Sequence, residues 1–309
     1  MTRIAVIGAG LIGRAWSIVF ARAGFEVALW DPDAAAVPAA RDFIAARLPE
    51  LADAGLLAEA PAAVLARLRQ ATTLAEAVAG VAHVQENGPE RVADKQALFA
   101  ELDRLAAPET ILASSTSGIP ASAFTEHLPG RARCLVAHPV NPPYLIPLVE
   151  LCPAPWTAPA SVAATRALME RAGQVPVTVN HELPGFVLNR LQGALLAETF
   201  RLLAQDAISP EDLDATVKHG LGLRWSFMGP LETIDLNAPG GLADYCARYD
   251  ALYAQMQREM TPMAWDPALV ARLQGARRAA LPEAAVPARH AWRDQRLMAL
   301  AAHRAKQPE

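Results

Sequence analysis

Three glycines and an aspartate near the start of the sequence have the types and spacing of a nucleotide-binding turn. Gly8, Gly10 and Gly13 follow the pattern G-x-G-x-x-G, and Asp31 comes 18 residues after the last of them. Gly8 permits a tight turn, Gly10 lets a pyrophosphate approach the backbone, and Gly13 lets a helix pack closely on a sheet. A helix N-terminus adds unpaired N–H groups and a partial positive charge, which together favour a bound diphosphate.

The residues around these glycines supply the elements that such a turn requires. Ile4–Ile7 is strand-like, Leu11–Ala23 has apolar residues at helical intervals, and Phe25–Trp30 is a second strand-like run that ends at Asp31. This order separates a dinucleotide fingerprint from a glycine-rich turn in another α/β fold. Asp31 would accept hydrogen bonds from ribose hydroxyls and repel a 2′-phosphate, which favours NAD over NADP. The cofactor-binding candidates in this stretch are Gly8, Gly10, Leu11, Ile12, Gly13 and Asp31.

A histidine and a glutamate in the middle of the chain are candidates for proton transfer. His138 ends the strand-like run Cys134–Ala137, and Glu150 lies near the end of the next run, twelve residues later. A histidine with a carboxylate partner is a good proton acceptor from an alcohol, while the cofactor takes the hydride from the same carbon. Ser117 and Asn189 are uncharged groups that could orient the reacting oxygen. These four residues are the catalytic candidates.

Polar residues gather in four short stretches that we expect at strand ends. In open α/β sheets, ligands bind at the carboxyl ends of the strands. The stretches are Gln85–Glu90, Ser114–Gly118, His138–Pro143 and Leu148–Glu150. All four are therefore expected at the carboxyl ends of parallel strands, on the cofactor side of the sheet.

Strand-like and helix-like stretches alternate up to about residue 184. The strand-like runs after Trp30 are Gln70–Thr73, Ala82–Gln85, Thr110–Ser114, Cys134–Ala137, Leu145–Leu151 and Gln174–Val179. The helix-like stretches include Asp94–Ala106, Ala158–Ala172 and an Ala-rich segment over 34–69, broken at Pro49 and Gly55, which predicts an inserted helical hairpin. The alternation predicts an α/β fold, a Rossmann-type doubly wound parallel sheet.

Only helical patterning follows Pro184. Phe186–Leu203 forms a long apolar helix pattern, and Ser209-Pro210 reads as an N-cap with proline at the first helical position. Further helices are expected at Leu242–Met260, Pro267–Arg278 and His290–Lys306. The prediction is therefore a nucleotide-binding domain over 1–184, followed by an all-α domain over 185–309 that serves substrate binding and dimerisation.

The composition limits the classes of partner and compartment. The chain has 309 residues and a formal net charge of −4, without the basic surplus that nucleic-acid binding favours. No apolar run is long enough to predict a membrane-spanning helix. Cys134, Cys152 and Cys246 show neither metal nor disulfide spacing, which suits a reducing cytosol. We therefore expect a cytoplasmic protein with a small-molecule substrate, no metal, no membrane and no nucleic acid.

Several longer motifs resemble the 3-hydroxyacyl-CoA dehydrogenase superfamily, and most of all its lambda-crystallin and L-gulonate 3-dehydrogenase branch. They are SSTSGIP, AHPVNPPYLIPLVEL, GFVLNRLQ, HGLGLRWSFMGPLETIDLN and WRDQRLMAL. The resemblance implies a nicotinamide domain, a helical domain that helps form a homodimer, and a catalytic pair at His138 and Glu150. It implies substrate contacts at Ser117 and Asn189, and it adds NAD contacts at Glu90 and Lys95.

The substrate class depends on the branch. The acyl-CoA enzymes typically carry aromatic residues after the histidine, where this chain has Pro139-Val140 and Pro142-Pro143. The branch resemblance implies oxidation of L-gulonate at its 3-hydroxyl. Arg224 could then bind the carboxylate of a sugar acid through bidentate hydrogen bonds, with Arg190 as a second candidate.

Two other functions are also compatible with the sequence. The first is a 3-hydroxyacyl-CoA dehydrogenase, for instance of 3-hydroxybutyryl-CoA, because a CoA site needs basic groups for its phosphates. The arginines of the inserted segment that could serve it are Arg41, Arg47, Arg67 and Arg69. The second is a non-catalytic, crystallin-like protein that binds NAD; intact candidates at all four catalytic positions argue against it.

Overall fold

The computed structural model describes residues 2–307, which form two compact units. Unit 1 comprises the chain up to Asn189 together with the chain from His290 onward, and unit 2 comprises Arg190–Arg289. The sequence places one boundary near residue 184 and keeps 185–309 together. The structure differs because the last helix packs with the nucleotide-binding part rather than with the helical part.

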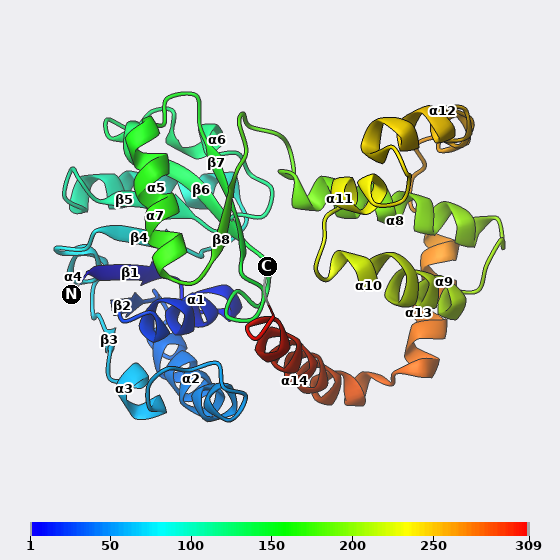
Figure 1. Cartoon of the computed structure of the whole chain (residues 1–309). Coiled ribbons are helices and arrows are strands. Elements are labelled where there is room, and N and C mark those ends of the chain that lie inside the picture. The colour runs from blue at the N-terminus through cyan, green and yellow to red at the C-terminus, as the bar shows by residue number, and fades with distance from the viewer. Residues whose placement is uncertain (1, 308–309) are drawn as a thin grey trace. The chain divides into compact units, whose positions relative to one another are not determined.

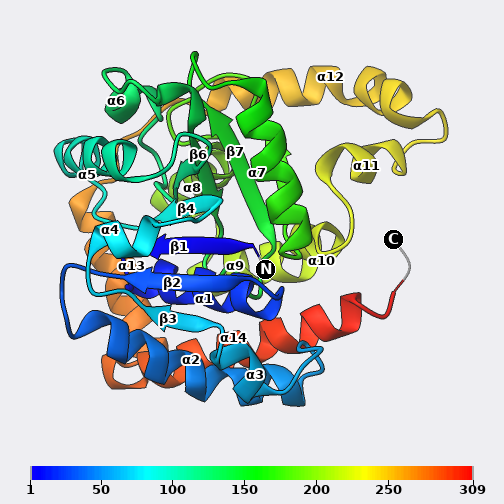
Figure 2. The same ribbon diagram turned by 90° about the vertical axis from the view of Figure 1, so that its left-hand side faces the viewer.

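Unit 1 contains one eight-stranded sheet with helices on both faces (Figures 1 and 2). The strand order is β3-β2-β1-β4-β5-β6-β7-β8. The strands are β1 (Arg3–Ile7), β2 (Glu26–Trp30), β3 (Leu68–Gln70), β4 (His83–Glu86), β5 (Ile111–Ser114), β6 (Cys134–Pro139), β7 (Leu148–Pro153) and β8 (Val175–Thr178). All neighbours are parallel except β6 and β7. The predicted Rossmann-type doubly wound sheet is confirmed.

Alternating side chains of the strands build a hydrophobic core on each face of the sheet. In β1, Ile4 and Val6 join one core while Ala5 and Ile7 join the other. The first core is covered by α1 (Leu11–Arg22), α2 (Ala36–Asp53), α7 (Pro159–Arg171) and α14 (Val286–Arg304). The second is covered by α4 (Leu74–Val78), α5 (Val92–Leu105) and α6 (Ser122–Thr125).

The direction of β7 corrects one prediction. The Leu148–Glu150 stretch was expected at the carboxyl end of a parallel strand, but β7 is antiparallel to β6, so the stretch begins its strand. Only residues 140–147 connect the two strands, which is too short for the crossover that a parallel pair requires. The start of an antiparallel strand lies at the same edge as the ends of its parallel neighbours. Glu150 therefore still reaches the predicted side of the sheet.

Two local predictions also need correction. Pro49 does not break the inserted segment but lies inside α2; the chain turns instead at Gly55, which has a φ of +73°. The short α3 (Pro61–Leu65) follows and completes the predicted pair of helices. The predicted strand Gln70–Thr73 ends at Gln70, because the Thr73 hydroxyl accepts the backbone N–H of Glu76 and caps α4.

All regular secondary structure among the described residues of unit 2 is helical, and the unit has a small core. It contains α8 (Leu188–Ala204) from Arg190 onward, α9 (Pro210–Thr216), a π-helical turn at Val217–Leu221, α10 (Gly222–Trp225), α11 (Pro230–Asp235), α12 (Gly241–Glu259), α13 (Pro267–Ala280) and the 3₁₀ turn Glu283–Ala285. Leu203, Leu213 and Leu269 are its buried cluster. The all-α character predicted for this region is confirmed.

The helix α14 returns the chain to unit 1 and packs there beside α2 (Figures 1 and 2). Met298 enters the first core, and Asp294 is 6% exposed. Asp294 accepts a 3.4 Å hydrogen bond from the Tyr144 hydroxyl and lies 3.9 Å from the Arg47 guanidinium. Unit 1 thus contains residues from both ends of the described chain. No helix within residues 2–307 has the length and apolar character to cross a membrane.

Candidate active site

The glycine turn between β1 and α1 is built for close backbone packing on one side and open space on the other. Gly8 has a φ of +91°, and a Cβ added there would lie 2.8 Å from the Asn87 carbonyl oxygen. A Cβ on Gly13 would lie 1.8 Å from the Gly8 carbonyl oxygen, so only glycine fits. A Cβ on Gly10 would meet nothing within 4 Å. The turn therefore leaves an unobstructed approach to the start of α1.

The start of α1 and the end of β2 meet at this turn. No side chain caps the N-terminus of α1, whose N-cap residue is Gly10. Leu11 is 56% exposed there, and Ile12 packs at the edge of the first core. The Asp31 carboxylate accepts the Ala9 backbone N–H at 2.7 Å, which fixes the acid beside the glycine turn. This uncapped helix start with an anchored acid fits the diphosphate and the ribose of a dinucleotide.

His138 and Glu150 face each other across neighbouring strands. They are paired residues in the antiparallel register of β6 and β7, and His138 Nδ1 lies 2.9 Å from Glu150 Oε2. The two side chains are 6% and 1% exposed. Phe186, which is buried, lies against the imidazole with ring centroids 5.4 Å apart. The carboxylate therefore holds one ring nitrogen and leaves Nε2 for another partner.

The second oxygen of Glu150 is held by backbone groups that the sequence does not reveal. Oε1 accepts the N–H groups of Val187 and Leu188 at 2.8 and 2.9 Å, just where α8 begins. Burial alone would raise the pKa of Glu150, but the hydrogen bonds from His138, Leu188 and Val187 hold that pKa below its ordinary value. The glutamate is thus kept as an anion beside the histidine. The trace of this arrangement in the sequence is Gly185, which has a φ of +74° two residues before Val187.

The other two catalytic candidates lie close together in unit 1. Asn189 Nδ2 donates a 2.6 Å hydrogen bond to the Ser117 carbonyl oxygen. Asn189 follows directly on Leu188, which binds Glu150, so the start of α8 connects the serine loop to the His138–Glu150 pair. The structure therefore brings all four catalytic candidates to one edge of the sheet.

The two residues added by family resemblance have different surroundings. The Glu90 side chain is 48% exposed and accepts hydrogen bonds from the loop that carries Ser117. Lys95 is 1% exposed, and its Nζ lies 2.9 Å from Glu86 Oε2 in a buried ion pair that Ser114 completes with a 2.5 Å hydrogen bond. Lys95 is thus engaged inside unit 1, and its contact with NAD remains a prediction.

Arg224 and Arg190 belong to unit 2 and remain predictions. Arg224 lies in α10 and is half-buried, while Arg190 in α8 is exposed. Neither guanidinium has a hydrogen-bond or ion-pair partner among residues 2–307.

Family models cover most of the chain. The model of the 3-hydroxyacyl-CoA dehydrogenase NAD binding domain matches residues 3–182, and that of the 3-hydroxyacyl-CoA dehydrogenase C-terminal domain matches residues 185–277. The chain belongs to the 3-hydroxyacyl-CoA dehydrogenase family. Its first match identifies NAD as the cofactor, and the glycine turn and Asp31 fit that cofactor. In this family the reaction is oxidation of a hydroxyl group with NAD.

Three relatives illustrate the range of this family. A lambda-crystallin homolog from Bos taurus is 44% identical over 96% of this chain and 94% of its own length. An L-carnitine dehydrogenase from Streptomyces coelicolor is 41% identical over 78% of this chain and 75% of its own. This chain also resembles the crystal structure of an NAD⁺-dependent 5-formyl-3-hydroxy-2-methylpyridine 4-carboxylic acid 5-dehydrogenase. The match covers 100% of each chain, with a TM-score of 0.86 and 28% sequence identity.

Proposed function

We propose that this dehydrogenase oxidises the 3-hydroxyl of a small free hydroxy acid, with L-gulonate as the best candidate and 3-dehydro-L-gulonate as the product. The observation that carries the proposal is the buried His138–Glu150 pair in the same unit as the glycine turn. The likeness to a lambda-crystallin homolog supports the branch. Carnitine and the pyridine carboxylic acid named for two relatives are also free acids, which supports the substrate class.

The proposed mechanism assigns one task to each side chain. His138 Nε2 accepts the hydroxyl proton, while Glu150 keeps Nδ1 protonated and stabilises the imidazolium that forms. The glycine turn and Asp31 would hold NAD, which would supply the acceptor for the hydride of the carbinol carbon. Ser117 and Asn189 orient the reacting oxygen, and Asn189 also fixes the serine loop through the Ser117 carbonyl.

The surroundings of the four arginines weigh against the acyl-CoA alternative. Arg41 Nη1 donates to the Leu68 carbonyl oxygen at 2.5 Å, and Arg47 pairs with Glu50 at 2.5 Å. Arg67 forms a 2.6 Å ion pair with Glu59, and Arg69 is paired with Glu76. Each guanidinium therefore already has a partner inside unit 1, with which a CoA phosphate would have to compete.

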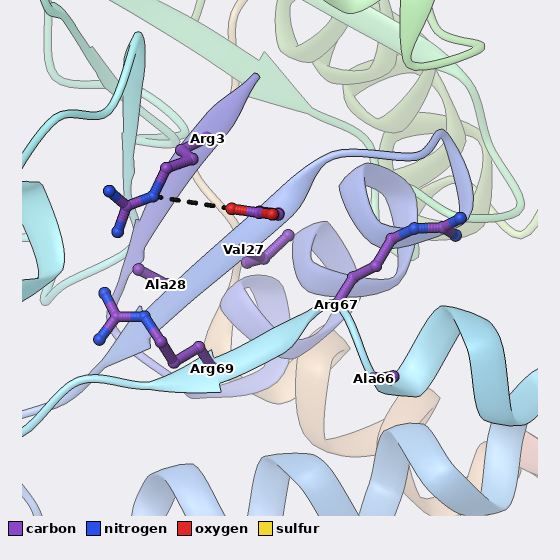
Figure 3. A pocket seen from close by; sticks show the side chains of 7 residues that line it. Arg3, Val27, Ala28, Ala66, Arg67 and Arg69 are labelled. Atoms are coloured by element: carbon purple, nitrogen blue, oxygen red, sulfur yellow. Dashed lines mark ion pairs between the residues drawn. The ribbon is translucent and has the colours of Figure 1, made fainter. Parts of the chain in front are cut away.

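A hollow lined by two of these arginines, Arg67 and Arg69, lies at the edge of the sheet opposite the nucleotide-binding turn. It measures about 350 Å³ and is lined by Arg3, Glu26, Val27, Ala28, Ala66, Arg67 and Arg69. These residues lie at the amino ends of β1 to β3, opposite the glycine turn. Figure 3 shows the Arg67 guanidinium directed away from those of Arg3 and Arg69, so the three do not converge on one phosphate.

A substrate comparison tests the proposed function. We expect the protein with NAD to oxidise L-gulonate with a kcat/KM at least about tenfold above that for 3-hydroxybutyryl-CoA, since the arginines available for CoA are already paired. Initial rates of NADH formation with the two substrates measure this ratio. A preference for the CoA ester would overturn the free-acid assignment, and no turnover of either would favour the non-catalytic reading.

The pH dependence should have opposite signs in the two directions. Oxidation needs a neutral imidazole and should rise with pH, while reduction of the ketone needs the imidazolium and should fall. Glu150→Gln should lower kcat in both directions, because the imidazolium that forms during oxidation loses its anionic partner. The same glutamate should affect stability. Because its pKa is lowered in the folded protein, ionised Glu150 stabilises the fold above the ordinary carboxyl range, and this stabilisation is lost as the pH falls through the lowered pKa. The free energy of unfolding of Glu150→Gln should therefore depend less on pH in the acid range. Initial rates in both directions and acid melts measure these effects; coincident profiles would contradict the scheme.

The surface of unit 2 supports the proposed homodimer. Many large apolar side chains of unit 2 are exposed in the single chain, whereas only a small cluster is buried in its core. Extensive exposed apolar surface is typical of an interface with another protein. The most exposed among them are Leu191, Leu223, Phe227, Leu231 and Leu236. A second copy covering these residues would bury them, and the mass in solution would reveal such a dimer.

A further inference from the structure

One carboxylate oxygen of Glu90 lies at the focus of three hydrogen-bond donors from the loop after β5. Oε1 accepts the Thr116 hydroxyl at 2.5 Å, the Ser117 backbone N–H at 3.0 Å and the Gly118 backbone N–H at 3.2 Å. Successive backbone N–H groups that converge in this way form a concavity for an anion. We call these three donors the carboxylate nest. The chain itself supplies the carboxylate that fills it.

The donors of the nest are held firmly by the protein, whereas the Glu90 side chain that occupies it is half exposed. Thr116 is 1% exposed, and its hydroxyl oxygen also accepts the Ile119 N–H at 3.0 Å, which fixes the turn of the loop. The carbonyl oxygen of Ser117 is held by Asn189. Glu90 instead has a side chain that is 48% exposed and lies 3.9 Å from Lys95, which is already paired with Glu86. Glu90 can therefore exchange with another carboxylate from solvent, while the donors stay in place and remain paired.

The loop that carries the nest and Glu150 of the catalytic pair are both hydrogen-bonded to the start of α8. In the parallel register of β5 and β6, Ser114 pairs with Val136, so two residues later the chains reach Thr116 and His138. Neighbouring strands are about 4.8 Å apart. A 3-hydroxy acid has a single carbon between the carbinol carbon and its carboxylate, which suits a hydroxyl at His138 and a carboxylate at the adjacent strand end.

We propose that the Thr116 hydroxyl and the Ser117 and Gly118 amides bind the carboxylate of the hydroxy-acid substrate, and that Glu90 occupies this site in the free protein. The proposal rests on the free-acid function above and names the site for that acid. The substrate replaces one carboxylate by another, so the donors are never left unpaired. A thioester has no such anion and does not displace Glu90 in this way.

Binding without NAD tests the proposal. We expect Glu90→Ala to lower the Kd of 3-hydroxybutyrate about tenfold, because a tethered side chain competes at an effective concentration in the millimolar range. The neutral 3-hydroxybutyramide should show no gain. Glu90→Gln, which keeps an uncharged oxygen in the nest, should give a smaller gain. Titration calorimetry on the NAD-free protein measures all three.

The control and the location of the ligand complete the test. Glu182→Gln alters another carboxylate that accepts a backbone N–H in unit 1, that of Ser122 at 2.8 Å, and should leave the affinity unchanged. In ¹⁵N-labelled Glu90→Ala, 3-hydroxybutyrate should shift the amide signals of Ser117 and Gly118. An unchanged Kd, an equal gain for the amide, or shifts that miss both signals would overturn the proposal, and loss of affinity in Arg224→Ala alone would assign the carboxylate to that arginine.

These outcomes are independent of the identity of the natural substrate. If the wild-type protein fails to oxidise L-gulonate while Glu90→Ala still gains affinity for 3-hydroxybutyrate over its amide, the carboxylate nest stands and the gulonate assignment falls. If L-gulonate is oxidised and the gain is absent, the function stands and the nest does not bind the carboxylate.

Discussion

Replacing His138 by glutamine should lower kcat for alcohol oxidation about a thousandfold, while the Kd for NAD stays within about twofold of the wild type. Glutamine fills much of the same volume and can still bond to Glu150, but it cannot accept a proton at neutral pH. The loss should therefore appear in kcat rather than in binding. Stopped-flow rates with saturating NAD and a fluorescence titration of NAD separate the two.

A matched histidine provides the control for this variant. His127 lies in the same unit and is exposed, and His127→Gln should leave kcat unchanged. If His138→Gln kept a kcat within about threefold of the wild type, the proton acceptor would have to be another group. The Glu150 partnership would then be purely structural.

The two glycines of the nucleotide turn should fail in different ways when alanine replaces them. Gly13→Ala should lower the free energy of unfolding by about 3 kcal/mol, because its Cβ would lie 1.8 Å from the Gly8 carbonyl oxygen and the backbone must move. Gly10→Ala meets nothing within 4 Å and should keep wild-type stability, yet weaken NAD binding about a hundredfold by narrowing the approach to the pyrophosphate. Urea unfolding and NAD titration of both variants measure the contrast.

Two results for Gly10→Ala would contradict the prediction. If Gly10→Ala lost stability as well, the open space beside Gly10 would not be the reason for its glycine. Full NAD affinity in a folded Gly10→Ala protein would argue against pyrophosphate binding at the start of α1. Gly24→Ala, at a φ of +85° in the turn after α1, separates general backbone strain from either effect.

Features that depend on local chemistry could be predicted from the sequence. The glycine spacing fixes a turn and a helix start within a few residues, so β1, α1 and β2 follow directly from it. His138 and Glu150 were predicted to meet from residue type and separation, and the structure brings them within hydrogen-bond distance. Such inferences succeed because each needs only neighbouring residues or a short connection.

Features that depend on distant backbone could not be predicted in this way. The N–H groups of Val187 and Leu188 that hold Glu150 are common to every residue and leave no mark in the sequence. The burial of Lys95 depends on Glu86 and Ser114, which the order of the sheet brings together. The antiparallel direction of β7, in contrast, could have been predicted, because the eight residues between β6 and β7 are too few for a crossover connection.

The return of α14 to unit 1 has a consequence for how the protein is made. During synthesis, β1 to β8 leave the ribosome well before Asp294 and Met298, and the whole of unit 2 is translated in between. Until α14 arrives, the apolar surface that will receive Met298 faces solvent, and the buried Tyr144 hydroxyl lacks its carboxylate partner. The NAD-binding unit therefore completes its folding only after unit 2 has been translated, because its last helix follows unit 2 in the chain.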